Sequence, residues 1–228
     1  MDDGSPEIFA SVQGEGVSAG VPSTFVRLAT CNLRCSWCDT AYTWDWDRFD
    51  RNTQVMEAAV DVVEAEVRAR APKNVVLTGG EPLIQRRALE ALARTLKTDG
   101  YRIEVETNGT IAPGALAGVI HQWNVSPKLR NSGNEGLTRL PEESLHEFAA
   151  LPNAYFKFVV STPDDIEEIE GIQERFAIPA TRTVLMPEGT TAASLNARSP
   201  WLAEICAARG YRFSSRLHIL IWGDKRGV

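Results

Sequence analysis

Short runs of β-branched and other apolar residues alternate along the chain with longer stretches whose apolar positions recur at helical spacing. The runs predict strands over residues 23–29, 75–78, 102–106, 123–125, 155–160, 181–186 and 217–222. The longer stretches predict helices over residues 53–70, 86–97, 141–150, 164–175 and 195–209. Strands that alternate with helices in this way indicate βα units and a mainly parallel sheet.

The number of units limits the possible folds, because roughly six βα units are too few for the usual eight-unit closed barrel. A partly open barrel and a doubly wound sheet both fit the pattern. In either fold, ligands bind where the strands end at their carboxyl side. Four polar or glycine-rich motifs follow predicted strands: the cysteine-containing loop 30–40 and the segments 78–82, 106–109 and 126–128. We therefore expect these motifs to form one site.

Composition is typical of a globular enzyme. The chain has 228 residues, 43% hydrophobic and 24% charged, which favours a single domain spanning residues 1–228. No apolar run approaches the roughly 20 residues that cross a bilayer, and residues 1–6 are too acidic and polar for a signal peptide. We expect a cytoplasmic protein with no membrane partner, in which disulfides are rare and clustered cysteines more often serve metal binding or catalysis.

The formal net charge of −6 argues against nonspecific attachment to nucleic acid, which needs a basic surface. It remains compatible with a small anionic substrate held by a few local arginines.

Three of the four cysteines, Cys31, Cys35 and Cys38, lie within eight residues. A structural zinc site needs four ligands, and the loop offers three with no histidine nearby. A redox dithiol of Cys35 and Cys38 would leave Cys31 unexplained. An electron-carrying 4Fe–4S cluster takes four thiolates, so three would leave one iron open to a ligand that is not protein. A cluster with one open iron explains the loop better than zinc does, and zinc explains it better than a redox dithiol does. The fourth cysteine, Cys206, is expected to be a buried apolar thiol.

The Cys-x-x-x-Cys-x-x-Cys spacing after the first predicted strand resembles the radical S-adenosylmethionine (SAM) enzymes. The resemblance implies a partial (β/α)6 barrel and a 4Fe–4S cluster on Cys31, Cys35 and Cys38. It also implies SAM bound at the open iron, where an electron splits it to give a 5′-deoxyadenosyl radical. The aromatic Trp37, before the third cysteine, suits the family, whose members often carry one beside the adenine.

Without the family, Gly79-Gly80-Glu81-Pro82 is a strand-to-helix turn, and Asn108-Gly109 is an ordinary turn. The resemblance instead implies that these strand ends bind SAM: the glycine–glutamate element at its amine, Glu106 at its ribose, and residues 126–128 at its carboxylate or ribose. The implied SAM contacts are Ser36, Trp37, Cys38, Asp39, Gly80, Glu81, Glu106, Ser126, Pro127 and Lys128.

Three further segments narrow the resemblance. These are Ser11-Val12-Gln13-Gly14-Glu15-Gly16, Cys38-Asp39-Thr40, and Arg216-Leu217-His218 with Trp222-Gly223. Together they resemble the 7-carboxy-7-deazaguanine synthase family, carbon–nitrogen lyases of queuosine and deazapurine biosynthesis. The resemblance covers nearly the whole chain. It implies conversion of 6-carboxy-5,6,7,8-tetrahydropterin to 7-carboxy-7-deazaguanine with loss of ammonia, SAM being regenerated in each turnover.

The substrate's carboxylate suits the two-pronged guanidinium of Arg27. The implied substrate contacts are Val12, Gln13, Gly14, Glu15, Arg27, Thr78 and His218, although His218 is equally compatible with a histidine satisfied inside a last strand. Members of this family need Mg²⁺, and Thr40 matches the position that supplies its oxygen. A lone threonine is a weak Mg²⁺ site, so we expect the substrate's carboxylate to complete it. Many relatives carry glutamine where Met186 stands, which weakens the case for a cofactor contact there.

The family further implies a homodimer and an electron donor such as flavodoxin or ferredoxin. Two alternatives stay open from the sequence. One is a radical SAM activase that makes a glycyl radical on a partner protein; such activases share the short cysteine spacing but lack the Gln-Gly-Glu-Gly stretch. The other is a noncatalytic zinc-binding module.

Overall fold

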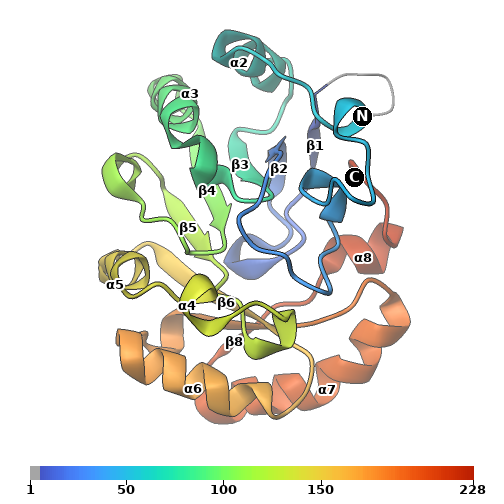
Figure 1. Ribbon diagram of the computed structural model, residues 1–228, viewed down its shortest axis with the longest axis vertical. Helices are drawn as coiled ribbons and strands as arrows, with labels where there is room; N and C mark the ends of the chain where they lie inside the picture. The colour runs from blue at the N-terminus through green and yellow to red at the C-terminus, as the bar shows by residue number, and fades with distance from the viewer. Residues whose placement is uncertain (1–5) are drawn as a thin grey trace.

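Eight strands form one sheet in which spatial order equals sequence order. The computed structural model describes residues 6–228 (Figure 1); residues 1–5, on which the expectation of no signal peptide largely rests, lie outside that range. The strands are β1 (Ile8–Val12), β2 (Pro22–Leu28), β3 (Asn74–Gly79), β4 (Arg102–Thr107), β5 (Gln122–Val125), β6 (Ala154–Val160), β7 (Thr183–Pro187) and β8 (Arg212–Phe213). β1 is antiparallel to β2, and every later neighbouring pair is parallel. The sheet is open, as expected for a partial barrel.

The helices are α1 (Arg51–Gln54), α2 (Val60–Arg68), α3 (Arg86–Thr98), α4 (Gly136–Arg139), α5 (Glu142–Ala150), α6 (Asp165–Phe176), α7 (Ala192–Arg209) and α8 (Leu217–Trp222). Of these, α2, α3, α5, α6 and α7 lie around the outside of the curved sheet (Figure 1). Most elements lie within three residues of the ranges that the hydrophobic pattern predicts. The strands that it missed are the two edge strands, β1 and β8.

The two faces of the sheet differ in polarity because side chains alternate along each strand. On β4, Ile103 and Val105 belong to the main hydrophobic core, between the sheet and the helices. Glu104 and Glu106 occupy the alternate positions. The same alternation puts Trp123 of β5 in that core. The concave face is therefore polar, and it is the face available to a ligand.

A hydrogen-bonded network of side chains from β4 and β5 fills part of that concave face. The Glu104 carboxylate is completely buried and accepts hydrogen bonds from the side-chain amides of Gln122 and Asn124, both at 3.1 Å. Arg102 donates to Gln122 at 2.7 Å and also pairs with Glu104. Such a connected network fixes its members, so the floor beneath the site, including Asn124, is rigid.

The prediction of a last strand over residues 217–222 was wrong, since this segment forms α8. A short apolar run does not distinguish a strand from a buried helix, and the sheet already ends at β8. Of its apolar residues, Ile219 is buried whereas Ile221 is 52% exposed. The Leu217 N–H donates to the Gly14 carbonyl at 2.8 Å. The end of the chain thus returns to the β1 edge and covers the Gln-Gly-Glu-Gly segment.

The predicted helix over residues 53–70 was too long. Residues 55–59 lie between α1 and α2, and Val55 is extended (φ −115°, ψ 127°). Val62 was expected on the apolar side but is 44% exposed. Residues 55–58 instead line a second cavity beside β2, so tertiary packing overrides the helical propensity of this segment.

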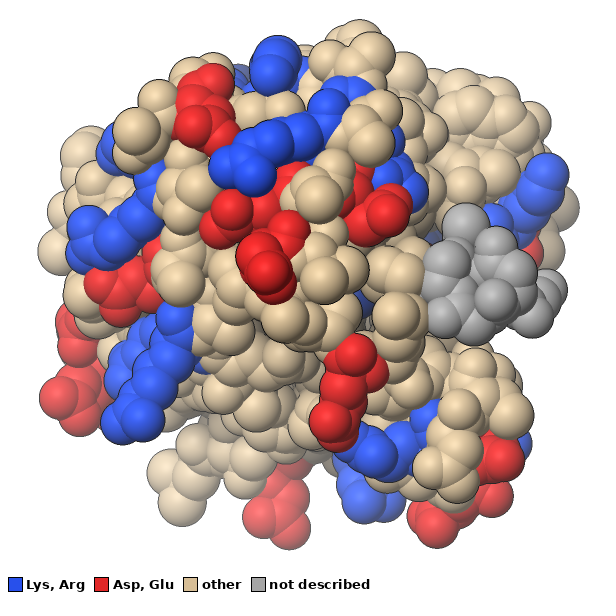
Figure 2. Space-filling view, turned by 90° about the horizontal axis from the view of Figure 1, so that it is seen from above, with Lys and Arg blue, Asp and Glu red and all other residues tan. Residues whose placement is uncertain are grey.

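The surface over α2 and α3 carries interspersed acidic and basic side chains (Figure 2). Arg68 pairs with Glu64 and Asp99, and Arg94 pairs with Glu90. These contacts are ion pairs within or between neighbouring elements, which leaves no single-sign patch on this face. Within residues 6–228, no helix is both long and apolar enough to span a bilayer.

Candidate active site

A cavity of about 460 Å³ opens at the carboxyl ends of the strands, a size suited to small ligands. Its wall combines the predicted substrate, cofactor and metal-binding residues from segments far apart in sequence. The predicted residues on the wall are Val12, Gln13, Gly14, Glu15, Arg27, Cys31, Cys35, Trp37, Cys38, Asp39, Thr40, Thr78, Gly80, Glu106, Ser126, Lys128 and His218. Ser36, Glu81 and Pro127 do not reach it.

Each cysteine sulfur of the loop has an N–H donor beside it. Cys31 Sγ accepts from the Leu33 backbone N–H at 3.5 Å. Cys35 Sγ accepts from Asn134 Nδ2 at 3.3 Å, and Cys38 Sγ from Trp44 Nε1 at 3.2 Å. N–H donors favour the thiolate form of a sulfur, and hydrogen bonds to the sulfurs are a normal feature of iron–sulfur sites. The three donor sets therefore fit a cluster held by thiolates.

Without metal the thiols of Cys31 and Cys35 stay protonated, because burial raises the pKa of Cys31 to about 11 and also raises the pKa of Cys35. A bound iron centre would supply the positive charge that makes them thiolates. Among residues 6–228, no three His, Cys, Asp or Glu side chains gather where one ion could sit. A tetrahedral zinc needs such convergence on one point, whereas a cube distributes its thiolates over separate irons. The three cysteines, each with an N–H donor at its sulfur, fit the cluster.

Cys206 lies apart from this loop. It is 3% exposed on α7 and contacts the Arg212 carbonyl at 3.7 Å. Burial raises its pKa to about 11, and it is absent from the cavity wall. The expectation of a buried apolar thiol is confirmed, and Cys206 is not placed to serve as a fourth ligand.

The Gly79-Gly80 turn presses against the beginning of the cysteine loop. Gly80 N donates to the Leu28 carbonyl at 2.9 Å, and Glu81 N donates to the Thr30 carbonyl at 2.8 Å. A Cβ on Gly79 would lie 2.0 Å from the Leu28 oxygen, and one on Gly80 would lie 2.2 Å from the Thr30 oxygen. Glycine is required here because two backbones meet at van der Waals distance.

The Glu81 carboxylate is held inside the protein rather than on the cavity wall. Glu81 is completely buried, and its two oxygens accept from Leu83 N at 3.0 Å, Thr107 Oγ1 at 2.8 Å and Asn108 N at 2.7 Å. It caps the following 3₁₀ turn and ties the end of β3 to the end of β4. The carboxylate is directed into the protein, so Gly79 and Gly80 are what this motif presents to the cavity, and a contact of Glu81 with SAM stays a prediction.

Ser36 and Pro127 also lie off the cavity wall, and their contacts with SAM stay predictions. Ser36 is exposed and its backbone N–H donates to the Ser132 carbonyl at 3.0 Å, which anchors the cysteine loop from outside. Pro127 is buried behind the wall. Its neighbours Ser126 and Lys128 do face the cavity, and Lys128 Nζ donates to Ser126 Oγ at 2.8 Å.

Glu106 organises predicted substrate contacts. Its carboxylate accepts from Gln13 Nε2 at 3.0 Å and from Thr78 Oγ1 at 2.7 Å. Gln13 Oε1 in turn accepts the Glu15 backbone N–H at 3.1 Å. These bonds fix the orientation of the Gln13 amide, so β3, β4 and the Gln-Gly-Glu-Gly segment form one connected wall.

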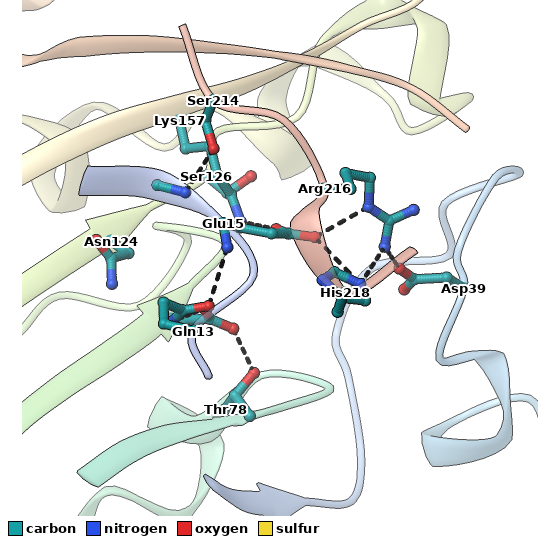
Figure 3. Close-up of polar contacts among 12 residues, drawn as sticks. Gln13, Glu15, Asp39, Thr78, Asn124, Ser126, Lys157, Ser214, Arg216 and His218 are labelled. Atoms are coloured by element: carbon teal, nitrogen blue, oxygen red, sulfur yellow. Dashed lines mark hydrogen bonds and ion pairs between the residues drawn. The ribbon is translucent and has the colours of Figure 1, made fainter. Parts of the chain in front are cut away.

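A charged cluster crosses the cavity beside this wall (Figure 3). The Glu15 carboxylate pairs with Lys157 of β6 on one oxygen and with Arg216 Nε at 3.0 Å on the other. Arg216 also pairs with Asp39 and donates to the Gly189 carbonyl at 2.7 Å. Burial alone raises the pKa of Glu15, but the two cations hold it well below its ordinary value. Glu15 is therefore a permanent anion.

His218 lies over the Gln-Gly-Glu-Gly segment. A Cβ on Gly14 would meet His218 Nδ1 at 2.0 Å, so Gly14 makes room for this ring. The His218 ring reaches Glu15 Oε1 at 3.9 Å. Burial lowers the pKa of His218, which keeps the ring neutral near pH 7.

A second ion-paired cluster holds Arg27. Arg27 Nε pairs with Glu7 Oε1 at 2.8 Å, and Arg226 pairs with the other Glu7 oxygen at 2.7 Å. Tyr42 also donates to Glu7, at 3.1 Å. Among residues 6–228 the two terminal nitrogens of Arg27 have no hydrogen-bond partner, and the side chain lies on the cavity wall. The guanidinium is positioned by Nε and keeps a free fork for an anion.

Sequence reasoning missed several wall residues, chiefly Asn124, Lys157, Glu188 and Arg216 as a site residue. It also missed Glu7, which is not on the wall but holds Arg27. For two of them the sequence pattern was sufficient to predict a place in the site. Lys157 and Asn124 are polar residues inside otherwise apolar strands, at positions where alternation directs them to the concave face. Arg216 lies outside the motifs' strand ends and joins the site only through the return of the chain end, whereas the pairing of β1 with β2 brings Glu7 next to Arg27.

The chain is similar to known proteins over nearly its full length. The model of the radical SAM superfamily matches residues 26–122. The curated 7-carboxy-7-deazaguanine synthase of Pyrobaculum aerophilum is 41% identical, over 97% of this chain and 95% of the relative. That of Halobacterium salinarum is 40% identical, over 96% and 90%.

Solved structures extend the likeness to the fold. The crystal structure of QueE from Escherichia coli superposes with a TM-score of 0.68 at 27% identity, covering 93% of each chain. Streptococcus suis SuiB bound to S-adenosylmethionine gives 0.57 at 13% identity, over 87% of this chain and 51% of SuiB, and it bears on the fold alone. With this sequence identity over nearly its full length, the chain belongs to the 7-carboxy-7-deazaguanine synthase family of the radical SAM superfamily.

Proposed function

We propose that this enzyme converts 6-carboxy-5,6,7,8-tetrahydropterin to 7-carboxy-7-deazaguanine with loss of ammonia, as a carbon–nitrogen lyase. The observation that carries the proposal is the cavity wall itself. It holds the three N–H-supported cysteines and the free fork of Arg27 within one enclosure. The reaction needs a cluster at which the radical forms and a place to bind the carboxylate of the substrate, and this cavity has a site for each. One domain, residues 1–228, carries both.

The chain's own side chains bind and orient the two reactants. When bound, the 4Fe–4S cluster and SAM supply the radical that removes a hydrogen atom from the substrate. Gly80, Ser126 and Lys128 form the wall next to the cysteines and suit the amine and carboxylate of SAM. Arg27 binds the substrate's carboxylate and Glu15 accepts from its pyrimidine end. The protein thereby holds the reacting carbon in reach and excludes water.

Mg²⁺ fits the site only as a shared ion. Thr40 lies on the cavity wall, with its hydroxyl 3.7 Å from Cys38 Sγ. One hydroxyl is too little for Mg²⁺, which prefers six oxygen ligands and keeps waters. The substrate's carboxylate and waters would complete the shell, so Mg²⁺ and the substrate bind together.

The remaining partners belong to the same proposal. A flavodoxin or ferredoxin would reduce the cluster, and a homodimer is the form expected for this family. A cytoplasmic location, where thiols stay reduced, is part of the same proposal.

Replacing Arg27 with alanine is expected to weaken substrate binding by about 1.5–3 kcal/mol, since a charged hydrogen bond is lost. The cluster should remain, because Arg27 does not contact the cysteines. Isothermal titration of the reconstituted enzyme with substrate measures the change, and iron analysis serves as the control. An unchanged dissociation constant would remove Arg27 from the substrate site.

The experiment that tests the function is an anaerobic turnover assay. Reconstituted enzyme is incubated with SAM, a reductant and carboxytetrahydropterin, with and without Mg²⁺. The proposal expects ammonia and a deazapurine in equal amounts, with SAM conserved and Mg²⁺ raising the rate. SAM cleavage without deazapurine would favour the glycyl-radical activase, and a colourless zinc protein would favour the noncatalytic module.

A further inference from the structure

Lys157 is a buried cation to which the proposed reaction assigns no role. It occupies an inward position of β6 between Phe156 and Phe158, which are completely buried on the opposite face. Its side chain is 10% exposed and lies on the cavity wall. Its one hydrogen-bond partner among residues 6–228 is Glu15. An ammonium group has three donors, so two remain for a ligand.

The charge of Lys157 is permanent. Burial by itself lowers its pKa, but the carboxylates of Glu15 and Glu106 raise it above its ordinary value. A group that holds its proton this firmly is a poor general acid near pH 7. Lys157 therefore acts as a hydrogen-bond donor to a fixed acceptor.

Glu15 beside it has the opposite character. Its carboxylate is ionised and can only accept hydrogen bonds. Lys157 occupies one oxygen and Arg216 the other (Figure 3). Each oxygen retains acceptor capacity, because a carboxylate offers about four lone-pair sites. The wall thus presents an acceptor and a donor side by side.

We propose that Glu15 and Lys157 together read the lactam edge of the pterin, Glu15 accepting from N3–H and Lys157 donating to the C4 carbonyl oxygen. This inference rests on the proposed pterin substrate. It makes Lys157 a specificity-determining residue: the ion pair matches a 4-oxo ring and opposes a 4-amino ring.

The positions of the binding groups support this orientation. Arg27 is on β2 and Lys157 is on β6, four strands along the sheet. Adjacent strands lie about 4.8 Å apart, so the path along the sheet is roughly 19 Å and the distance across the curved face is shorter. A flat bicyclic ring with its carboxylate at Arg27 directs its pyrimidine end toward β6. That end carries N3 and O4.

A 4-amino ring reverses both hydrogen bonds. Its N3 is an acceptor facing the Glu15 carboxylate, and its amino group is a donor facing the Lys157 ammonium. Sites built to bond one pattern reject the reversed pattern strongly, because buried charged groups are left unpaired. We expect the wild-type enzyme to discriminate by at least about 100-fold, as one or two charged hydrogen bonds are lost.

The test uses two oxidised, fluorescent probes that do not turn over, pterin-6-carboxylate and 2,4-diaminopteridine-6-carboxylate. Both are titrated into anaerobic holoenzyme with SAM and Mg²⁺, and dissociation constants are read from fluorescence. Lys157→Met should raise the dissociation constant of the 4-oxo probe by about 10- to 100-fold and remove most of the difference in affinity between the two probes. Lys157→Arg keeps hydrogen-bond donors at this position and should restore the preference for the 4-oxo probe.

Two controls separate this role from a general loss of structure. Arg27→Ala should raise the dissociation constants of both probes by the same factor, because both carry the carboxylate. Lys73→Met, which removes an exposed lysine stacked on Tyr101, should leave both constants unchanged. Cluster content and the thermal unfolding midpoint of Lys157→Met show whether that variant is folded.

The outcomes distinguish the inference from the function. Tight wild-type binding of the 4-amino probe, or discrimination that survives in a folded Lys157→Met variant, would overturn the lactam reading while leaving the pterin substrate in place. Failure of the wild-type enzyme to bind pterin-6-carboxylate, together with no deazapurine in the turnover assay, would overturn both.

Discussion

Replacing Cys31, Cys35 or Cys38 with alanine is expected to abolish both the iron–sulfur cluster and SAM cleavage. Each sulfur lies on the same cavity wall and has its own N–H donor. No other cysteine lies on that wall to replace the one removed. Two thiolates would leave two irons without protein ligands, and metal binding of this kind depends on the full ligand set. Iron and sulfide analysis after anaerobic reconstitution, with detection of 5′-deoxyadenosine, measures both losses.

Cys206→Ala is the matched control for these variants. It removes a buried thiol from α7, at a stability cost of about 1 kcal/mol. The cluster and SAM cleavage should both persist. If a single variant among Cys31, Cys35 and Cys38 kept about four irons per chain and cleaved SAM, the cluster assignment would be wrong.

Gly80→Ala is expected to be nearly as damaging. Its Cβ would stand 2.2 Å from the Thr30 carbonyl oxygen and 3.0 Å from Cys31 Cβ. The neighbour is backbone, so the strand ends must separate, at a cost of at least about 2–3 kcal/mol. Thr30 already has a φ of +79°, which is an uncommon conformation for threonine. A shift of the first cysteine by about 1 Å should lower turnover by about 100-fold.

Gly118→Ala is the control for this substitution, because a Cβ there would meet nothing within 4 Å. Its unfolding midpoint and turnover should match those of the wild type. Chemical denaturation and the rate of deazapurine formation measure both variants. Wild-type stability and deazapurine formation in Gly80→Ala would show that the two backbones are not in tight contact.

Much of the fold follows from hydrophobic spacing, because the parallel strands are buried and bounded by glycine or asparagine. The failures lie where spacing is uninformative. Residues 217–222 are apolar without a clear period, and their helix depends on the contact of Leu217 with Gly14. β1 was missed because it is an antiparallel edge strand whose pairing with β2 depends on the turn between them.

The candidate site was predictable where motifs end strands, and less so where chain segments return from a distance. Alternation along β6 was sufficient to place Lys157 on the concave face, and this signal was overlooked. Glu81 shows that residue type alone does not reveal where a side chain points. Its residue type suggested a ligand for an ammonium group, whereas its position between the Leu83, Thr107 and Asn108 donors makes it a structural cap.

The central claim is that three protein thiolates leave one iron of the cluster free for SAM. The most direct measurement is the electron paramagnetic resonance spectrum of the anaerobically reduced cluster, recorded before and after SAM is added. Coordination at a free iron should change the g-values on SAM addition, and Cys206→Ala should give the same change. A spectrum that SAM leaves unaltered in fully reconstituted protein would mean that the fourth iron is already occupied, which contradicts the account.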